Sequence, residues 1–572
     1  MTDLLIESGN ELETASETAP ESEAANRSRW SRARLIARRT MSVLAFALLW
    51  FALVAPYHPE QLHPSGFVRL PVEGLVLAGL ALVLPKRWNR VVAIAAGVLL
   101  ALLTVVKILD IGFYTALDRP FDPVSDWSYF GPAFGVLRDS AGHGWATAAE
   151  FGFGFLIVVV LTCIPLSVVH LNGLVRRHRK DTARVVGALT AVWLLLAALG
   201  LRIDAGQPVA STSAAGLAVN EVQLVRNSIH DEQVFQSALH GNDPYSTIPA
   251  ANLLSGLRGK DVIVAFVESY GRVAVQDSSI APGVDATLRT ATDQLNQIGY
   301  QSRSAFLTSP TFGGISWLAH STLQSGLWVN NENRYDDLVN SQRFTLSDAF
   351  HRAGWHTVGD VPSNTGDWPE GHSFYHYDQL YDRTNLGYFG PRFGYATMPD
   401  QFILSRFNEL ELSRTDRQPV MAEIDLVSSH IPWTPLPHLV PWDEIGDGSI
   451  YGPQAHEGPS RDAVWSNSAS VRAAYGQSIQ YSIGSLVSFV QNAHDPNLVL
   501  VVLGDHQPWT AVTGTGATHD VPISVVSSDP AVMNRIDSWG WQDGMLPSPG
   551  APVWRMDSFR NRFLNTFDSR VG

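Results

Sequence analysis

Apolar residues gather in five runs in the N-terminal part of the chain. The runs cover about residues 41–56, 68–85, 91–109, 149–169 and 185–203, and each approaches the length of a membrane span. A hydrocarbon core about 30 Å thick requires about 20 helical residues. The pattern therefore predicts five transmembrane helices within residues 40–205.

Basic residues flank these runs on one side of the predicted membrane. Arginines gather at 27–39, and further basic clusters cover 86–90 and 176–180. By the positive-inside rule, all three clusters face the cytoplasm. The sequence thus predicts a multi-pass protein of the cell membrane with a cytoplasmic N-terminus. The loop 110–148 and the large C-terminal part are then extracytoplasmic.

The segments on either side of the helices are polar. The first 25 residues carry seven acidic side chains and no basic one. Such a composition cannot bury a core, so residues 1–39 are predicted to form a disordered cytoplasmic tail with a basic end. Residues 206–255 are predicted to be an extracytoplasmic linker with one or two amphipathic helices.

From residue 256 onward, short β-rich runs alternate with helical stretches such as Leu346–Ala353 and Ala474–Gln491. Strands without polar alternation, separated by helices, indicate a sheet that is covered on both faces. Residues 256–572 are therefore predicted to form an α/β domain. The predicted strands are Val262–Val267, Val420–Leu426, Leu498–Leu503 and Val521–Val526.

Composition narrows the classes of function. Charged residues make up 16% of the chain and its formal net charge is −14. No nucleic-acid partner is expected, because a polyanion needs a basic face. Cys163 is the only cysteine, which excludes an intramolecular disulfide and a thiolate metal cluster. The oligomeric state stays unknown at this stage.

Polar side chains follow three of the predicted strands, at the edge where an open α/β sheet binds its ligands. Glu268 follows the first strand, His430 lies just after the second, and Asp505 and His506 follow the third. Carboxylate oxygens and imidazole nitrogens suit a borderline divalent cation such as Zn²⁺ or Mn²⁺. Taken singly, each residue is also compatible with a strand cap or a surface position.

A hydroxyl nucleophile is expected between residues 304 and 329. The pair Gly313-Gly314 precedes a helical stretch there. A hydroxyl at the start of a helix lies near free backbone amides that stabilise an alkoxide or a phosphate. An ordinary Ser or Thr helix cap explains the same pattern.

Five stretches of residues 256–572 carry a family resemblance, namely "VIVAFVESYGR" at 262–272, "TLSDAFHRAGWHTV" at 345–358, "FGYATMPDQFIL" at 393–404, "SSHIPWTPLP" at 428–437 and "VVLGDHQPW" at 501–509. In their order and spacing they resemble the sulfatase and alkaline phosphatase superfamily. With the preceding helices, the chain resembles the lipoteichoic acid synthases and, more distantly, the lipid A phosphoethanolamine transferases. The resemblance implies an alkaline-phosphatase-like extracytoplasmic domain after five transmembrane helices.

The resemblance implies a cation site and two active-site histidines. His430 matches the histidine of a Ser-His-x-Pro segment, and His519 looks like a further active-site histidine. The family binds one divalent cation, here Mn²⁺ or Zn²⁺. The implied ligands are Glu268, Ser316, Asp505 and His506.

Two residues compete for the role of nucleophile. Ser316 lies nine residues before Ser325-Gly326, which is the sulfatase spacing, and it is the preferred candidate. Thr311 is the alternative, because the synthases and phosphoethanolamine transferases use threonine. The Pro and Arg that follow a sulfatase nucleophile are missing, so a sulfate ester is a less expected substrate.

Asp360, Trp368 and Trp433 are the expected substrate-binding residues. Gly359-Asp360 matches a Gly-Asp pair of the synthases. These enzymes bind glycerol phosphate with a Trp-Asn-Arg group, whereas residues 366–370 keep Trp368 and lack the arginine. The head group therefore stays open between the phosphoglycerol and phosphoethanolamine types.

The leading hypothesis is a membrane-anchored transferase that depends on a metal and forms a covalent phospho-Ser or phospho-Thr intermediate. Its expected partners are a membrane lipid donor and an envelope glycan or glycolipid acceptor. One alternative is a hydrolase of the sulfatase or phosphodiesterase type. Another is a catalytically inactive protein that binds a component of the envelope.

Overall fold

The computed structural model describes residues 19–131, 134, 138, 143–204, 207–277 and 279–569, which fall into two compact units. The N-terminal unit contains Met1–Leu109 and Val136–Val222. The C-terminal unit contains Asp110–Gly135 and Gln223–Gly572. The loop between the third and fourth predicted membrane helices thus belongs partly to the C-terminal unit. The predicted domain boundary at residue 256 did not include it.

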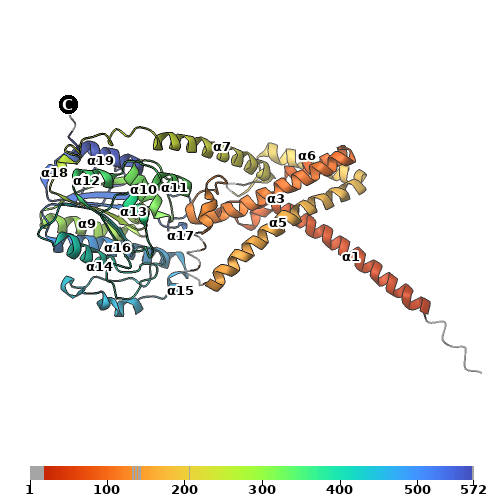
Figure 1. Cartoon of the computed structure of the whole chain (residues 1–572). Helices are drawn as coiled ribbons and strands as arrows, with labels where there is room; N and C mark the ends of the chain where they lie inside the picture. The colour runs from red at the N-terminus through yellow and green to blue at the C-terminus, as the bar shows by residue number, and fades with distance from the viewer. Residues whose placement is uncertain are drawn as a thin grey trace, which may run out of the picture. The chain divides into compact units, whose positions relative to one another are not determined.

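Each of the five predicted apolar runs forms a helix. Figure 1 labels α1, α3, α5 and α6. In the described part of the chain, four helical segments are long and apolar enough to cross a membrane, namely Arg32–Val54 within α1 and the helices α3, α5 and α6. The number of spans stays a prediction. The five helices are α1 (Ala19–Val54), α2 (Val72–Val83), α3 (Lys86–Leu117), α5 (His143–Arg177) and α6 (Arg179–Leu199).

Helices α1 and α2 differ from the predicted segments. Helix α2 has 12 residues, about 18 Å of helix, because Pro71 and Pro85 limit it at either end. Helix α1 begins at Ala19, within the segment that was predicted to be a disordered tail. Alanine, glutamate and arginine are strong helix formers and account for this extension. Residues 1–18 lie outside the described residues.

The C-terminal unit is built on a mixed nine-stranded sheet in the order β12-β6-β11-β10-β5-β9-β7-β8, with β13 beside β6. The strands β10, β5, β9, β7 and β8 run parallel to one another, whereas β11 is antiparallel to β10. The bounds are β5 (Asp261–Val267), β6 (Gln301–Thr308), β7 (His356–Val361), β8 (Gln379–Asp382), β9 (Val420–Leu426), β10 (Leu498–Gly504), β11 (Asp520–Ser527), β12 (Gln542–Asp543) and β13 (Val553–Arg555).

Helices cover both faces of this sheet, which confirms the predicted α/β class (Figure 1). The four predicted strands are all present and lie side by side as β11, β10, β5 and β9. One face carries α9 (Ala281–Gln297), α14 (Asp400–Phe407) and α16 (Ser468–Ala493). The other carries α10 (Ser316–Ser325), α12 (Leu346–Ala353), α18 (Pro530–Ile536) and α19 (Phe559–Phe567).

The predicted linker contains helix α7 (Ser213–Leu239), and the segment after it is held by a buried ion pair. Arg560 Nη1 lies 2.8 Å from Asp243 Oδ2, and Arg343 Nη2 lies 3.2 Å from the same oxygen. The Arg560 side chain is only 1% exposed. Asp243 therefore balances two cations that have little access to water.

Replacing this carboxylate should destabilise the C-terminal unit. Asp243→Asn leaves two buried guanidinium groups without a counter-charge, and breaking such a pair costs about 3–5 kcal/mol. We expect the unfolding transition of the full chain in detergent, followed by tryptophan fluorescence, to move to lower temperature. Asp231→Asn, at an exposed position, is the matched control. Equal transitions in the two variants would contradict this role of Asp243.

Candidate active site

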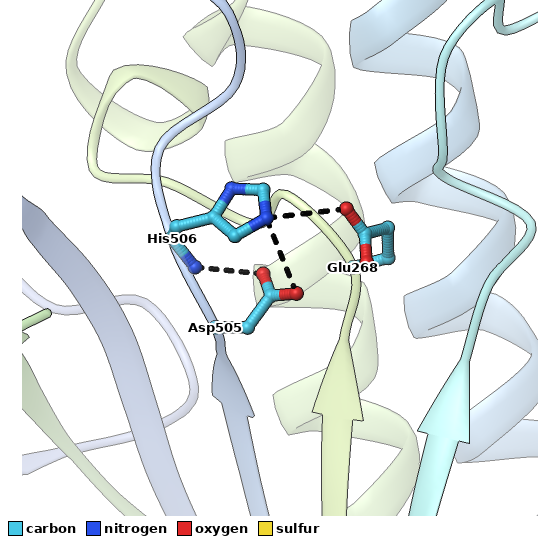
Figure 2. Close-up of side chains that lie close together, drawn as sticks. All are labelled: Glu268, Asp505 and His506. Atoms are coloured by element: carbon cyan, nitrogen blue, oxygen red, sulfur yellow. Dashed lines mark hydrogen bonds and ion pairs between the residues drawn. The ribbon is translucent and has the colours of Figure 1, made fainter. Parts of the chain in front are cut away.

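Two parallel strands bring three candidate metal ligands to one edge of the sheet. Gly504, the last residue of β10, lies opposite Val267, the last residue of β5. Glu268 follows β5, and Asp505 and His506 follow β10, so the three side chains meet (Figure 2). One ligand atom from each lies within 4.8 Å of the others.

The contacts within this group are close. His506 Nε2 lies 3.3 Å from Glu268 Oε1 and 3.5 Å from Asp505 Oδ2 (Figure 2). His506 Nδ1 lies 2.8 Å from the backbone oxygen of Gln507. Because a carbonyl only accepts, Nδ1 carries a proton and Nε2 is the atom directed at the carboxylates.

Backbone and hydroxyl groups hold the two carboxylates in place. The amides of Ser269 and His506 each donate to Asp505 Oδ1 at 2.7 Å. The Ser269 hydroxyl donates to Glu268 Oε1 at 2.8 Å. These bonds fix the orientation of both carboxylates independently of any ligand.

Ser316 joins the group from helix α10. Its hydroxyl donates to Glu268 Oε2 at 3.0 Å and lies 3.2 Å from His506 Nε2. The preceding residue, Ile315, has a φ of 67°, which is rare for a β-branched residue and costs about 1–3 kcal/mol. This turn places Ser316 at the first position of the helix.

Thr311, the alternative nucleophile, has a different partner. Its hydroxyl donates to the backbone oxygen of Gly314 at 2.7 Å. Gly313 and Gly314 have φ values of 70° and 157°, so the turn depends on residues without a side chain. Thr311 therefore stabilises the turn that leads to Ser316.

The buried charges shift one another's pKa values. Burial disfavours the imidazolium form of His506, but the Asp505 and Glu268 carboxylates outweigh burial and raise its pKa to about 9. Burial and the charge of Glu268 raise the pKa of Asp505 to about 6. Burial alone would raise the pKa of Glu268, yet the positive charge of His506 holds it well below its usual range.

The donor set fits a divalent cation. Two carboxylates and one imidazole nitrogen are ligand types that Zn²⁺ and Mn²⁺ both accept. The three side chains converge from two strand ends, and hydrogen bonds already hold both carboxylates. A cation there would balance the excess negative charge of the two carboxylates.

The two predicted active-site histidines lie on different loops, His430 after β9 and His519 before β11. His430 stacks on Tyr395 with ring centroids 3.8 Å apart. The charge of Glu268 acts to raise the pKa of His430, and the charge of His506 acts to lower it. His519 immediately precedes β11, and its ring lies 5.3 Å from that of Phe312. Burial lowers the pKa of both histidines.

The three predicted substrate-binding residues are differently placed. Asp360 is fully buried, and burial raises its pKa well above the usual value. Trp433 is 3% exposed, and its indole nitrogen donates to the backbone oxygen of Ser429 at 2.7 Å. Trp368 is half-buried against Tyr375. Substrate binding stays a prediction for all three, and burial favours a structural role for Asp360 and Trp433.

The sequence analysis did not identify a second group of possible metal ligands, which consists of His320, Glu423 and Asp425. His320, one helical turn after Ser316, stacks on Phe266 and lies 3.1 Å from Glu423 Oε1 and 3.4 Å from Asp425 Oδ1. Burial opposes the charged form of His320, but Asp425 and Glu423 raise its pKa to about 9. The ion pair ties α10 to β9. The spacing of Ser316 and His320 on one helix face was the available signal.

Comparison with known proteins gives matches among solved structures. No family model and no curated protein matches the chain. The lipoteichoic acid synthase LtaP from Listeria monocytogenes is 14% identical over 56% of this chain and 74% of its own, with a TM-score of 0.36. The phosphoglycerol transferase GacH from Streptococcus pyogenes, in complex with sn-glycerol-1-phosphate, is 13% identical over 59% and 81%, with a TM-score of 0.35. The soluble domain of lipooligosaccharide phosphoethanolamine transferase A from Neisseria meningitidis is 16% identical over 56% and 93%, with a TM-score of 0.33.

Cation binding should strengthen as the pH rises. Below about pH 9 the metal-free His506 carries a second proton, on Nε2. A cation that binds Nε2 must displace this proton. The apparent affinity should therefore rise about tenfold per pH unit between about pH 6 and 9. Calorimetric titration with Mn²⁺ in buffers of different ionisation enthalpy should show about one proton released near pH 7.5.

Variants test whether this cation binds at the proposed ligands. Glu268→Gln should weaken Mn²⁺ binding at every pH, whereas Asp293→Asn, at an exposed position on α9, should not. An affinity that does not change with pH, or equal binding by both variants, would show that these ligands do not hold the cation.

Proposed function

We propose that the chain is a membrane-anchored, metal-dependent phosphotransferase of the sulfatase and alkaline phosphatase superfamily. It moves a phospho-head group from a lipid donor to a hydroxyl of an envelope glycan or lipid through a phosphoserine at Ser316. The observation that carries this proposal is the contact of the Ser316 hydroxyl with Glu268 and His506 at the sheet edge.

The residues around Ser316 prepare its oxygen for attack. The Ser316 hydroxyl donates to Glu268 Oε2, so its proton points away from an incoming phosphorus atom. The start of α10 adds free backbone amides near the reacting centre, which favour negative charge there. Glu268, Asp505 and His506 would hold a cation that lowers the pKa of the serine hydroxyl and offsets phosphoryl charge.

The reaction then has two displacements. In the first, Ser316 Oγ forms a bond to phosphorus and the neutral imidazole of His430 or His519 takes the Ser316 proton. The bond to the lipid alcohol breaks, and the imidazolium gives that proton to the departing oxygen. In the second, the acceptor oxygen forms the new bond to phosphorus and the bond to Ser316 breaks. The same imidazole, again neutral, takes the acceptor's proton and returns a proton to Ser316 Oγ.

The membrane helices suit a lipid donor. Among the described residues, four helical segments are long and apolar enough to cross a membrane. A lipid confined to a bilayer meets an enzyme anchored in that bilayer more often than one in solution, because both move on the same surface. We therefore place the reaction at the extracytoplasmic face of the cell membrane.

Single substitutions separate the two candidate nucleophiles. Ser316→Ala should reduce turnover about a thousandfold or more, because it removes the proposed attacking oxygen. Thr311→Ala should retain measurable turnover, because it loses only a bond within the turn. Phosphatidylglycerol and phosphatidylethanolamine with labelled head groups are the substrates to test, and Ser413→Ala, at an exposed position, is the control.

The products and the trapped intermediate decide the outcome. Transfer gives a labelled conjugate of the acceptor, whereas hydrolysis gives free head group. Mass spectrometry of acid-quenched protein should find the phospho-head group on the peptide that contains Ser316. Undiminished turnover in Ser316→Ala would refute the proposed nucleophile.

A further inference from the structure

The loop after β9 is anchored beside the cation ligands. The Ser429 hydroxyl donates to the backbone oxygen of Glu268 at 2.6 Å. His430 follows Ser429 directly, so its backbone is fixed next to a residue that carries a proposed ligand. The charges that act on its ring come from Glu268 after β5 and from His506 after β10. His430 is therefore within electrostatic reach of the group that Ser316 contacts.

The His430 ring has one defined tautomer. Its Nδ1 lies 2.7 Å from the backbone oxygen of Ile431. Because a carbonyl only accepts, Nδ1 carries a proton and Nε2 is the basic atom. Burial lowers the pKa of His430, so the ring is neutral at neutral pH. Nε2 can thus accept the proton of a serine hydroxyl and release it later.

The other candidate proton carrier, His519, lies in a different electrostatic environment. The segment Asp110–Phe130 packs on the turn that leads to Ser316, because a Cβ atom at Gly313 would lie only 2.2 Å from the backbone oxygen of Ala116. Two charges of this segment act on His519, together with that of the next residue in the chain. The three side chains are Asp118, Arg119 and Asp520. The charges that act on His430 instead belong to the cation site.

Tyr395 lies in a tight turn that packs against the loop after β9. The amide of Phe393 donates to the backbone oxygen of Ala396 at 3.0 Å, and Gly394 between them has a φ of 64°. A Cβ atom at Gly394 would lie 3.0 Å from Pro432 Cδ. A glycine at this position therefore permits both the turn and its close approach to the loop.

This turn places the Tyr395 ring on one face of His430. The two ring centroids are 3.8 Å apart and the ring planes differ by 18°. The face of an aromatic ring attracts a cation that lies within about 6 Å of its centre. When His430 accepts a proton, its positive charge forms against the Tyr395 ring. The stacked ring thus limits the rotation of His430 and favours its charged form.

We propose that His430 carries the proton from Ser316 to the departing lipid alcohol, and that Tyr395 is its positioning residue. The Ser316 O–H bond breaks as Oγ bonds to phosphorus, and the proton moves to His430 Nε2. Nε2 releases it to the lipid oxygen when the bond between that oxygen and phosphorus breaks. The place of this pair in catalysis rests on the proposed function, whereas the effect of Tyr395 on His430 does not.

Two substitutions of Tyr395 separate the ring face from the apolar cover. Tyr395→Phe keeps the ring, whereas Tyr395→Leu covers His430 with an apolar side chain that has no aromatic face. Tyr395→Leu should lower kcat about tenfold and leave KM unchanged, because only the charged form of His430 loses an interaction. Tyr395→Phe should keep the wild-type kcat. Phe389→Leu, at a 78% exposed position four residues after Asn385, is the control.

A second measurement reports on His430 without turnover. Hydrogen–deuterium exchange at the imidazole Cε1, followed by mass spectrometry, gives the pKa of each histidine in the full chain. Tyr395→Leu should lower the pKa of His430 by about 0.5–1, because the imidazolium loses its aromatic neighbour. The pKa of His519 should stay the same in both Tyr395 variants. Tryptophan fluorescence on heating checks that each variant is folded.

The outcomes support or overturn each part of the proposal. An unchanged pKa of His430 in Tyr395→Leu, or an equal loss of kcat in Tyr395→Phe, would overturn the role of the Tyr395 ring. A larger loss of kcat in His519→Asn than in His430→Asn would overturn the choice of proton carrier. Full turnover in Ser316→Ala, with the pKa of His430 lowered in Tyr395→Leu, would refute the proposed nucleophile and leave the positioning by Tyr395 standing.

Discussion

The structure depends on the parallel pairing of β5 with β10, which places two carboxylates and an imidazole at one edge of the sheet. A shift of this register by one residue would move Glu268 relative to Asp505 and His506 and turn its side chain to the other face. Charges this deeply buried are stable only when they pair with each other or with a cation. The pairing of two apolar strands thus determines where the chemistry can take place.

Two layers of contacts then fix the hydroxyl. The strained turn at Ile315 directs Ser316 toward Glu268 and His506. Hydrogen bonds to the Ser269 hydroxyl and to the backbone oxygen of Gln507 hold these two side chains. One turn further along α10, His320 pairs with carboxylates on β9, which limits rotation of the helix. The position of Ser316 therefore depends on the turn before α10, on the ion pair of His320 one turn later, and on the strands that carry the carboxylates.

Much of this arrangement could be predicted from sequence because it is local. A strand followed by a polar residue is visible in the sequence, and parallel strands share an edge, so Glu268, Asp505 and His506 could be grouped in advance. The glycine pair before a helical stretch likewise pointed to Ser316 and Thr311. The different partners of these two hydroxyls could not be predicted from sequence: Ser316 contacts Glu268 and His506, whereas Thr311 donates to the backbone oxygen of Gly314.

Other features depend on contacts between distant residues. Glu423 and Asp425 alternate with apolar residues in β9, as side chains on a half-exposed strand do, and their partner His320 comes from another element. The packing of Asp110–Phe130 on the Ser316 turn joins residues about two hundred positions apart in sequence. Prolines near the ends of α2 shorten a run whose hydropathy alone indicated a full span.

The central claim is that Glu268, Asp505 and His506 hold a cation in contact with the Ser316 hydroxyl. Anomalous diffraction from crystals of the full chain grown with Mn²⁺ tests it most directly. The account predicts one dominant anomalous peak bounded by these three side chains and by Ser316 Oγ. The absence of a peak there, or a peak only between His320, Glu423 and Asp425, would contradict it.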